Sequence, residues 1–133
     1  MLRITLRDGE KAIINGAVIR AVGRTQLAVE NKVAVLRGRE IMRPEEATTP
    51  ARELYFAAML AYIDPAGRID HQDRIVALVG ALIAGLAPTN GKSACIRFAA
   101  EIAEGDYYRA LQTAREVIAI EDAAAQEAAC QAA

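Results

Sequence analysis

Arg43-Pro44-Glu45-Glu46-Ala47-Thr48-Thr49-Pro50 is the segment at which the sequence changes from one periodicity to another. Before it, apolar and polar residues alternate in steps of two, which is typical of half-buried strands. After it, apolar residues recur three and four positions apart, which is typical of amphipathic helices. We therefore predict an α+β fold, in which a small N-terminal antiparallel β-meander or barrel (1–43) is joined by a linker (44–50) to a C-terminal bundle of about four helices (51–122).

The strands of the N-terminal half are predicted from alternation and turn signals. Apolar residues at positions 2, 4 and 6 alternate with Arg3, Thr5 and Arg7, so the two sets are expected on opposite faces of the first strand. Asn15-Gly16 is a strong hairpin signal, because both residues tolerate the positive φ of a type I′ turn. Further strands are predicted over 11–14, 17–22, 25–30 and 33–37, with a last extended piece over 39–42.

The helices of the C-terminal half are predicted from caps and breakers. Thr49 is a good N-cap, with Pro50 at the first helical position. Helices are expected over 51–63, from a cap at Asp70 to near residue 87, over about 91–103 behind a cap at Asn90, and from a cap at Asp106 to about residue 122. The side of the third helix predicted to face inward carries Ile96, Ala99, Ala100 and Ala103. Residues 123–133 are mostly alanine without large apolar anchors, so we expect a frayed tail.

Charge is distributed very unevenly between the two halves. The whole chain has 16 Lys and Arg against 17 Asp and Glu, a net charge of −1 that argues against nucleic-acid binding. Up to Pro44, however, nine basic residues stand against four acidic ones, a net charge of +5. The remainder has seven basic and thirteen acidic residues, a net charge of −6. Such asymmetry indicates a nucleic-acid or membrane partner for the basic half.

The arginines of the basic half are the candidate RNA contacts. Arg3 and Arg7 share a face of the first strand, and Arg37 and Arg39 share a face of a later strand if the chain stays extended through Gly38. The planar guanidinium fork binds phosphate and guanine bidentately. The alternative is a solvated strand face with scattered salt bridges to acidic neighbours. The full candidate set is Arg3, Thr5, Arg7, Lys11, Arg37, Arg39 and Arg43.

Aromatic residues occur only in the helical half, beginning with Tyr55. The β half therefore lacks the rings on which RNA-binding sheets usually stack bases, which argues for recognition through arginines and backbone groups. Tyr55, Tyr107 and Tyr108 are candidates for a partner-binding surface. The alternative for these rings is core packing of the bundle, because large rings dominate both cores and interfaces.

Enzyme, cofactor and metal chemistry have no visible carrier in the sequence. Cys95 and Cys130 have no metal-ligand spacing beside them, and the single histidine, His71, is expected at the surface. Gly91-Lys92-Ser93 is not a P-loop, because a predicted helix and not a strand precedes it. The apolar run over 75–87 is too short to span a membrane, and the first residues show neither the apolar core nor the cleavage site of a signal peptide, so we expect none. We expect a cytoplasmic protein without a cofactor, a metal or a membrane partner.

Several segments closely resemble the FlbT family of flagellin regulators. They are INGAVI (14–19), LRGREIM (36–42), TPARELYF (49–56), YID (62–64), GDYYRAL (105–111) and ARE (114–116). The resemblance implies a cytoplasmic post-transcriptional regulator that associates with the 5′ untranslated leader of flagellin mRNA and alters its translation and decay. It also implies a small partner protein, FlaF.

The β half alone also resembles the carbon storage regulator (CsrA) family. The similarity lies in MLRITLRDGE (1–10) and VAVLRGREI (33–41). Those proteins are strand-exchanged dimers that grip RNA between a first and a last strand, and the resemblance places Arg37 at the key RNA-contacting arginine. One extra residue lies between Arg37 and Glu40. A β unit of this size is too small to be stable alone, so we expect the helical half, or a second chain in a homodimer, to cover it.

Two functions therefore remain open at the level of sequence. The first is an RNA-binding regulator whose basic half lies on the flagellin leader. The second is a protein-binding adaptor or chaperone-like module that acts through FlaF or flagellin and affects RNA only indirectly.

Overall fold

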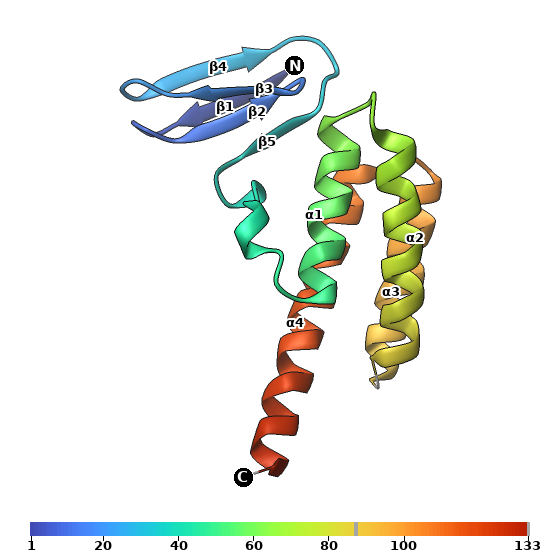
Figure 1. The fold of residues 1–133 in the computed structure, drawn as a ribbon. Coiled ribbons are helices and arrows are strands. Elements are labelled where there is room, and N and C mark those ends of the chain that lie inside the picture. The colour runs from blue at the N-terminus through green and yellow to red at the C-terminus, as the bar shows by residue number, and fades with distance from the viewer. Residues whose placement is uncertain (87, 133) are drawn as a thin grey trace. The chain divides into compact units, whose positions relative to one another are not determined.

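The computed structural model describes residues 1–86 and 88–132. The chain divides into two compact units, a β unit over Met1–Met42 and a helical unit from Arg43 onward. Five short strands precede four helices, so the predicted α+β class is confirmed (Figure 1).

The β unit consists of two small antiparallel sheets. Its strands are β1 (Leu2–Leu6), β2 (Lys11–Ile14), β3 (Ala17–Arg20), β4 (Thr25–Val29) and β5 (Val35–Arg37). β1 pairs with β4, while the other sheet has the order β3-β2-β5. Only β2 and β3, joined by Asn15 (φ 51°) and Gly16 (φ 82°), are consecutive strands that pair. The predicted hairpin is therefore confirmed, whereas the other strands do not follow the consecutive order of a simple meander.

Both sheets contribute side chains to the core of the β unit. Ile4 and Leu6 of β1 are buried together with Ala12 of β2 and with Ala21. Partly buried side chains pack around them, namely Ile14, Ile19, Leu27 and Val35. Burial of alternate residues of β1 leaves its odd-numbered positions on the outside.

The chain does not stay extended through Gly38, so the extended piece predicted over 39–42 is wrong. Gly38 has a φ of +57°, which favours glycine, and a 3₁₀ helix runs over Gly38–Glu40. The backbone N–H of Arg37 donates to Glu40 Oε1 over 3.1 Å and closes this turn. A second 3₁₀ helix, Pro44–Glu46, lies within the predicted linker.

The helical unit contains α1 (Pro50–Ile63), α2 (Arg68–Gly85), α3 (Thr89–Ala103) and α4 (Tyr107–Ala132). Thr49 Oγ1 accepts from the backbone N–H of Arg52 over 3.3 Å, which confirms the predicted cap. Asp106 caps α4 as predicted, since its Oδ1 accepts from the N–H of Arg109. The predicted caps of α2 and α3, Asp70 and Asn90, are wrong by three and two residues, because these helices begin earlier, after Gly67 and Pro88.

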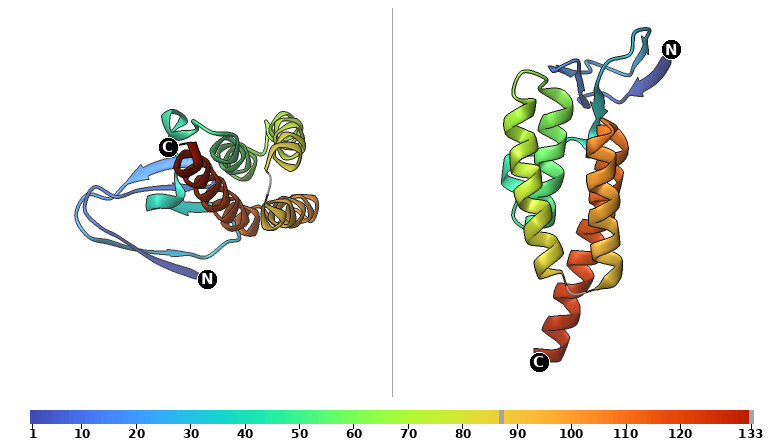
Figure 2. Two further views of the ribbon diagram at one scale, coloured as in Figure 1. Left: turned by 90° about the horizontal axis from the view of Figure 1, so that it is seen from below. Right: turned by 90° about the vertical axis from the view of Figure 1, so that its right-hand side faces the viewer.

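α4 continues about ten residues beyond its predicted end. Figure 2 shows this last part of α4 extending past the ends of the other helices. Its residues from Asp122 onward are mostly exposed, in agreement with the lack of large apolar anchors. Alanine has the highest helix propensity, so the helix persists there without a core to pack on.

α3 buries the face opposite to the predicted one. The buried residues are Gly91, Ala94, Cys95, Phe98 and Glu101. Ile96 is 61% exposed, and Ala99, Ala100 and Ala103 are exposed with it. Residues that are two positions apart in an α-helix point about 200° apart around its axis, so Ile96 and Phe98 cannot both face the core. The larger aromatic side chain takes the interior, and Glu101 is satisfied there by the hydroxyl of Thr113.

Polar contacts join the first turn of α1 to α4. The two terminal nitrogens of Arg52 each donate to an oxygen of Asp122 over 2.9 Å. The backbone N–H of Ala51 donates to Glu121 Oε2 over 2.9 Å, so this carboxylate satisfies one free amide at the start of α1. The hydrogen bond from Arg52 holds the pKa of Asp122 below its usual range.

This ion pair makes an acid-dependent contribution to stability. Because the pKa of Asp122 is lowered in the folded state, the contribution is present above the unfolded-state pKa of about 3.9 and is lost as the pH falls through the lowered value. Asp122→Asn should lower the free energy of unfolding at pH 6 by at most about 1 kcal/mol, since Asp122 is half exposed, and should have a smaller effect at pH 2. Denaturant unfolding at the two pH values measures this, with Glu127→Gln on the same helix as the control. An equal effect of Asp122→Asn at both pH values would contradict it.

Candidate nucleic-acid interface

The outer face of β1 carries three of the predicted contacts. Arg3, Thr5 and Arg7 are exposed because the residues between them, Ile4 and Leu6, are buried in the β-unit core. The alternation read from the sequence is therefore confirmed, and it places two guanidinium groups on one side of the strand and its immediate extension.

Arg37 connects the two sheets at this face. It ends β5, opposite Ala12 of β2, and its Nη1 donates to the backbone oxygen of Thr5 in β1 over 3.3 Å. Since β1 and β5 belong to different sheets, this side chain brings the first and last strands of the unit together. The side chain of Arg37 therefore lies against Thr5, one of the β1 residues in the candidate set.

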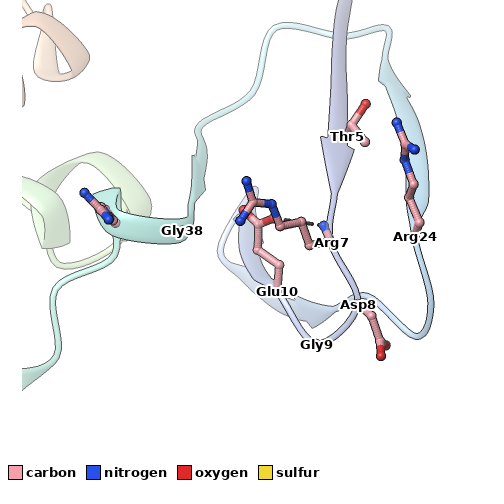
Figure 3. Close-up of a pocket in the computed structure, with 8 residues that line it drawn as sticks. Thr5, Arg7, Asp8, Gly9, Glu10, Arg24 and Gly38 are labelled. Carbon is pink, nitrogen blue, oxygen red and sulfur yellow. Dashed lines mark hydrogen bonds between the residues drawn. The ribbon is translucent and has the colours of Figure 1, made fainter.

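An open pocket lies at the end of β1 (Figure 3). We call it the arginine pocket, and its lining residues are Thr5, Arg7, Asp8, Gly9, Glu10, Arg24, Gly38 and Arg39. Arg39 does not share a strand face with Arg37 as predicted, because the positive φ of Gly38 ends the strand between them. The 3₁₀ turn nevertheless places Arg39 on the pocket wall.

Arg24 is a pocket residue that the sequence interpretation did not select. The last registered pair of β1 and β4 is Leu6 with Thr25, so the backbone positions of Arg7 and Arg24 follow one step further along the same two chains. Arg24 reaches this position because β1 pairs with β4. The predicted meander pairs β1 with its neighbour in sequence instead, so it did not point to Arg24.

The carboxylates of the pocket hold its turns. Glu10 Oε1 accepts from the backbone N–H of Arg7 over 2.9 Å, and Asp8 Oδ1 accepts from that of Gly23 over 2.8 Å. Under the alternative of a solvated strand face, these two carboxylates would form salt bridges with the arginines; the bonds that they form here are to backbone N–H groups. The glycine at position 38 lets Glu10 approach, because a Cβ there would lie 3.2 Å from Glu10 Oε2.

Two of the predicted contacts are not among the lining residues of the arginine pocket. Lys11 is registered opposite Arg20 on β2 and β3 and does not line the arginine pocket. Arg43 belongs to the helical unit, where its guanidinium lies 3.6 Å from Glu46.

The tyrosines proposed as partner contacts differ in exposure. Tyr55 is 2% and Tyr107 7% exposed, and each ring is covered by a guanidinium, that of Arg115 at 5.4 Å and that of Arg68 at 5.0 Å. Burial favours the core-packing alternative for these two rings. Tyr108 is 41% exposed and is the one of the three that presents its ring at the surface.

His71 and Cys95, for which no catalytic or metal-binding role was predicted, lie in the following surroundings. His71 Nε2 lies 3.1 Å from Asp64 Oδ2, and this hydrogen bond holds the pKa of Asp64 below its usual range. Burial raises the pKa of the Cys95 thiol, which makes it less reactive. Within residues 1–86 and 88–132, no three His, Cys, Asp or Glu side chains are grouped as metal ligands. None of the helices over these same residues has the length and apolar character needed to cross a bilayer.

Comparison with known proteins gives one consistent result. Residues 2–125 match the family model described as "Flagellar protein FlbT". The "Flagellum biosynthesis repressor protein FlbT" of Caulobacter vibrioides is 33% identical over 122 residues, covering 91% of this chain and 86% of the relative. A "Probable flagellum biosynthesis repressor protein FlbT" of Agrobacterium fabrum is 34% identical over 91% of this chain and 81% of its own. That of Brucella ovis is 45% identical over half of this chain and 44% of its own. No solved structure matches.

Proposed function

This chain belongs to the FlbT family of flagellar proteins, which are regulators and not enzymes, and we propose that it represses flagellum biosynthesis by binding RNA through its β unit. The target we propose is the 5′ untranslated leader of flagellin mRNA. The observation that carries the proposal is the gathering of Arg3, Arg7 and Arg37 on and beside β1, with Arg37 donating to the backbone of that strand.

The chemistry of this surface suits a backbone contact. Guanidinium groups bind phosphate oxygens through paired N–H donors, and Thr5 adds a hydroxyl on the same strand face. The β unit has no aromatic ring on which a base could stack, so binding depends on arginines and on the shape of the RNA. Translation would be altered by blocked ribosome loading, and decay by a recruited nuclease, without catalysis by this chain.

Replacing Arg3 and Arg37 together by alanine tests the proposal. A complex that neutralises several phosphates should lose affinity steeply with salt, and each lost contact to a single strand should reduce the slope of log K against log salt by about 0.7. We expect the double variant to bind a flagellin leader more weakly and with a slope smaller in magnitude by about 1.4. Filter binding or fluorescence anisotropy at salt concentrations from about 50 to about 300 mM measures both the affinity and the slope.

The matched control is Arg97→Ala with Arg109→Ala, which removes the same charge from exposed positions of the helical unit. It should leave affinity and slope unchanged. Unaltered binding by Arg3→Ala/Arg37→Ala, or a flat salt dependence of the unaltered protein, would refute direct RNA binding through the β unit.

We also propose that the protein acts in the cytoplasm as a homodimer and with a FlaF-type partner. The size of the β unit supports the homodimer, because a unit of about 42 residues buries little surface of its own. The negative charge of the helical half supports the FlaF-type partner, since this charge repels RNA and leaves the helices to bind a protein.

A second candidate function is the protein-binding adaptor, favoured by the exposed apolar side chains of the helical unit. Ile69 and Val76 of α2, Ile96 of α3 and Tyr108 of α4 are all largely exposed. In this case repression would survive Arg3→Ala/Arg37→Ala and would be lost on Tyr108→Ala, together with co-purification of the partner from nuclease-treated extract.

A further inference from the structure

Arg7 and Arg24 both line the arginine pocket. Their backbone positions lie just beyond the paired ends of β1 and β4, one step past the registered pair Leu6–Thr25. Neither guanidinium forms a hydrogen bond or an ion pair with any residue over 1–86 and 88–132. Both guanidinium groups are therefore available to a ligand of the arginine pocket.

The pocket around these arginines has the features of an anion site. Figure 3 shows Arg7 just past the end of β1, with its side chain extending toward Glu10, and Arg24 just before β4; Gly9 and Gly38 also line the pocket. Gly9 leaves room for a ligand to approach the backbone, since no heavy atom lies within 4 Å of a Cβ built there. Asp8 and Glu10 each accept a hydrogen bond from a backbone N–H, so they stabilise the turns beside the arginines.

We infer that the arginine pocket binds one phosphodiester group of RNA, and that Arg24 is a phosphate-contacting residue together with Arg7. This inference rests on the proposed function and identifies a contact within it. Three arginines against two carboxylates leave the pocket with a net charge of +1. That charge matches the single charge of an internal phosphodiester and not the several charges of a terminal triphosphate. The lack of aromatic rings in the β unit favours phosphate over a stacked base.

Arg24→Ala is the informative variant, because Arg24 is exposed and its removal takes nothing from the core. A flagellin-leader RNA with a 5′-hydroxyl end should bind this variant about tenfold more weakly or worse, with a salt slope smaller in magnitude by about 0.7. Arg24→Lys should restore the slope, since it keeps the charge, but not the full affinity, since it loses the paired donors. Arg109→Ala in the helical unit serves as the control for charge.

A second measurement examines the pocket without RNA. Inorganic phosphate, titrated into ¹⁵N-labelled protein, should shift the Nε–H signals of Arg7 and Arg24 and the amide signals of Gly9 and Gly38. In Arg24→Ala the remaining signals should not move. Arg20→Ala, which lies outside the pocket, should respond as the unaltered protein does.

The outcomes separate the pocket from the proposed function. If Arg24→Ala binds the leader with unchanged affinity and slope while Arg3→Ala/Arg37→Ala does not, the pocket inference is overturned and the function stands. If the unaltered protein fails to bind the leader but phosphate shifts the pocket signals, the function fails and the anion site stands for free phosphate. If phosphate leaves the signals unmoved and Arg24→Ala is silent, the anion site is refuted.

Discussion

Replacing Phe98 by alanine should lower the free energy of unfolding by about 3–5 kcal/mol. Phe98 is fully buried in α3, and its removal deletes most of an aromatic side chain from a core that cannot collapse around the space. Since small domains are stable by about 5–15 kcal/mol, this loss is a large share of the total. Urea unfolding followed by circular dichroism measures it as a lower midpoint with an unchanged slope.

Ile96→Ala is the matched control on the same helix. Ile96 is largely exposed, so the substitution should change stability by no more than about 0.5 kcal/mol. The pair also tests which face of α3 is inside. A large loss for Ile96→Ala with a small loss for Phe98→Ala would restore the face predicted from the sequence.

Gly91→Ala should destabilise the helical unit although alanine is the better helix former. A Cβ on Gly91 would overlap Cδ2 of Leu86, lie 3.0 Å from its Cγ and lie 3.3 Å from Cγ2 of Ile120. Leu86 is itself buried, so it cannot turn away into solvent. Overpacking of this kind costs about 1–3 kcal/mol, of which the helix propensity of alanine offsets at most about 1 kcal/mol.

Gly80→Ala provides the contrast within α2. No heavy atom lies within 4 Å of a Cβ built there, and Gly80 is exposed. The same chemical change should therefore stabilise the protein by up to about 1 kcal/mol. In thermal unfolding, the midpoint should fall for Gly91→Ala and rise for Gly80→Ala. A rise for both variants would show that the space beside Gly91 can adjust.

Local signals predicted the parts of the fold in which the cause is itself local. Asn15-Gly16 forms its hairpin, and Thr49 caps α1, because a turn and a cap depend on a few adjacent residues. The outward face of β1 was likewise predictable, since alternation along a single strand needs no knowledge of its partner.

The candidate site was predictable only in part, for the same reason. Arg3 and Arg7 follow from alternation, but Arg39 reaches the pocket through the turn at Gly38 and not along a strand. Arg24 becomes a neighbour of Arg7 because β1 pairs with β4, some twenty positions away in the sequence. Long-range pairing leaves no mark on the periodicity of either strand, so no pattern pointed to Arg24.

Sequence alone was sufficient for the division of this protein into a basic β unit and an acidic helical unit, because periodicity and charge are properties of adjacent residues. It was also sufficient for the family to which the chain belongs. The choice of Phe98 over Ile96 for the core, the burial of Tyr55 and Tyr107, and the placing of Arg7 and Arg24 on one pocket depended on the packing and pairing of distant segments. A residue's own pattern allows more than one such packing, and the competition for limited interior space selects one of them.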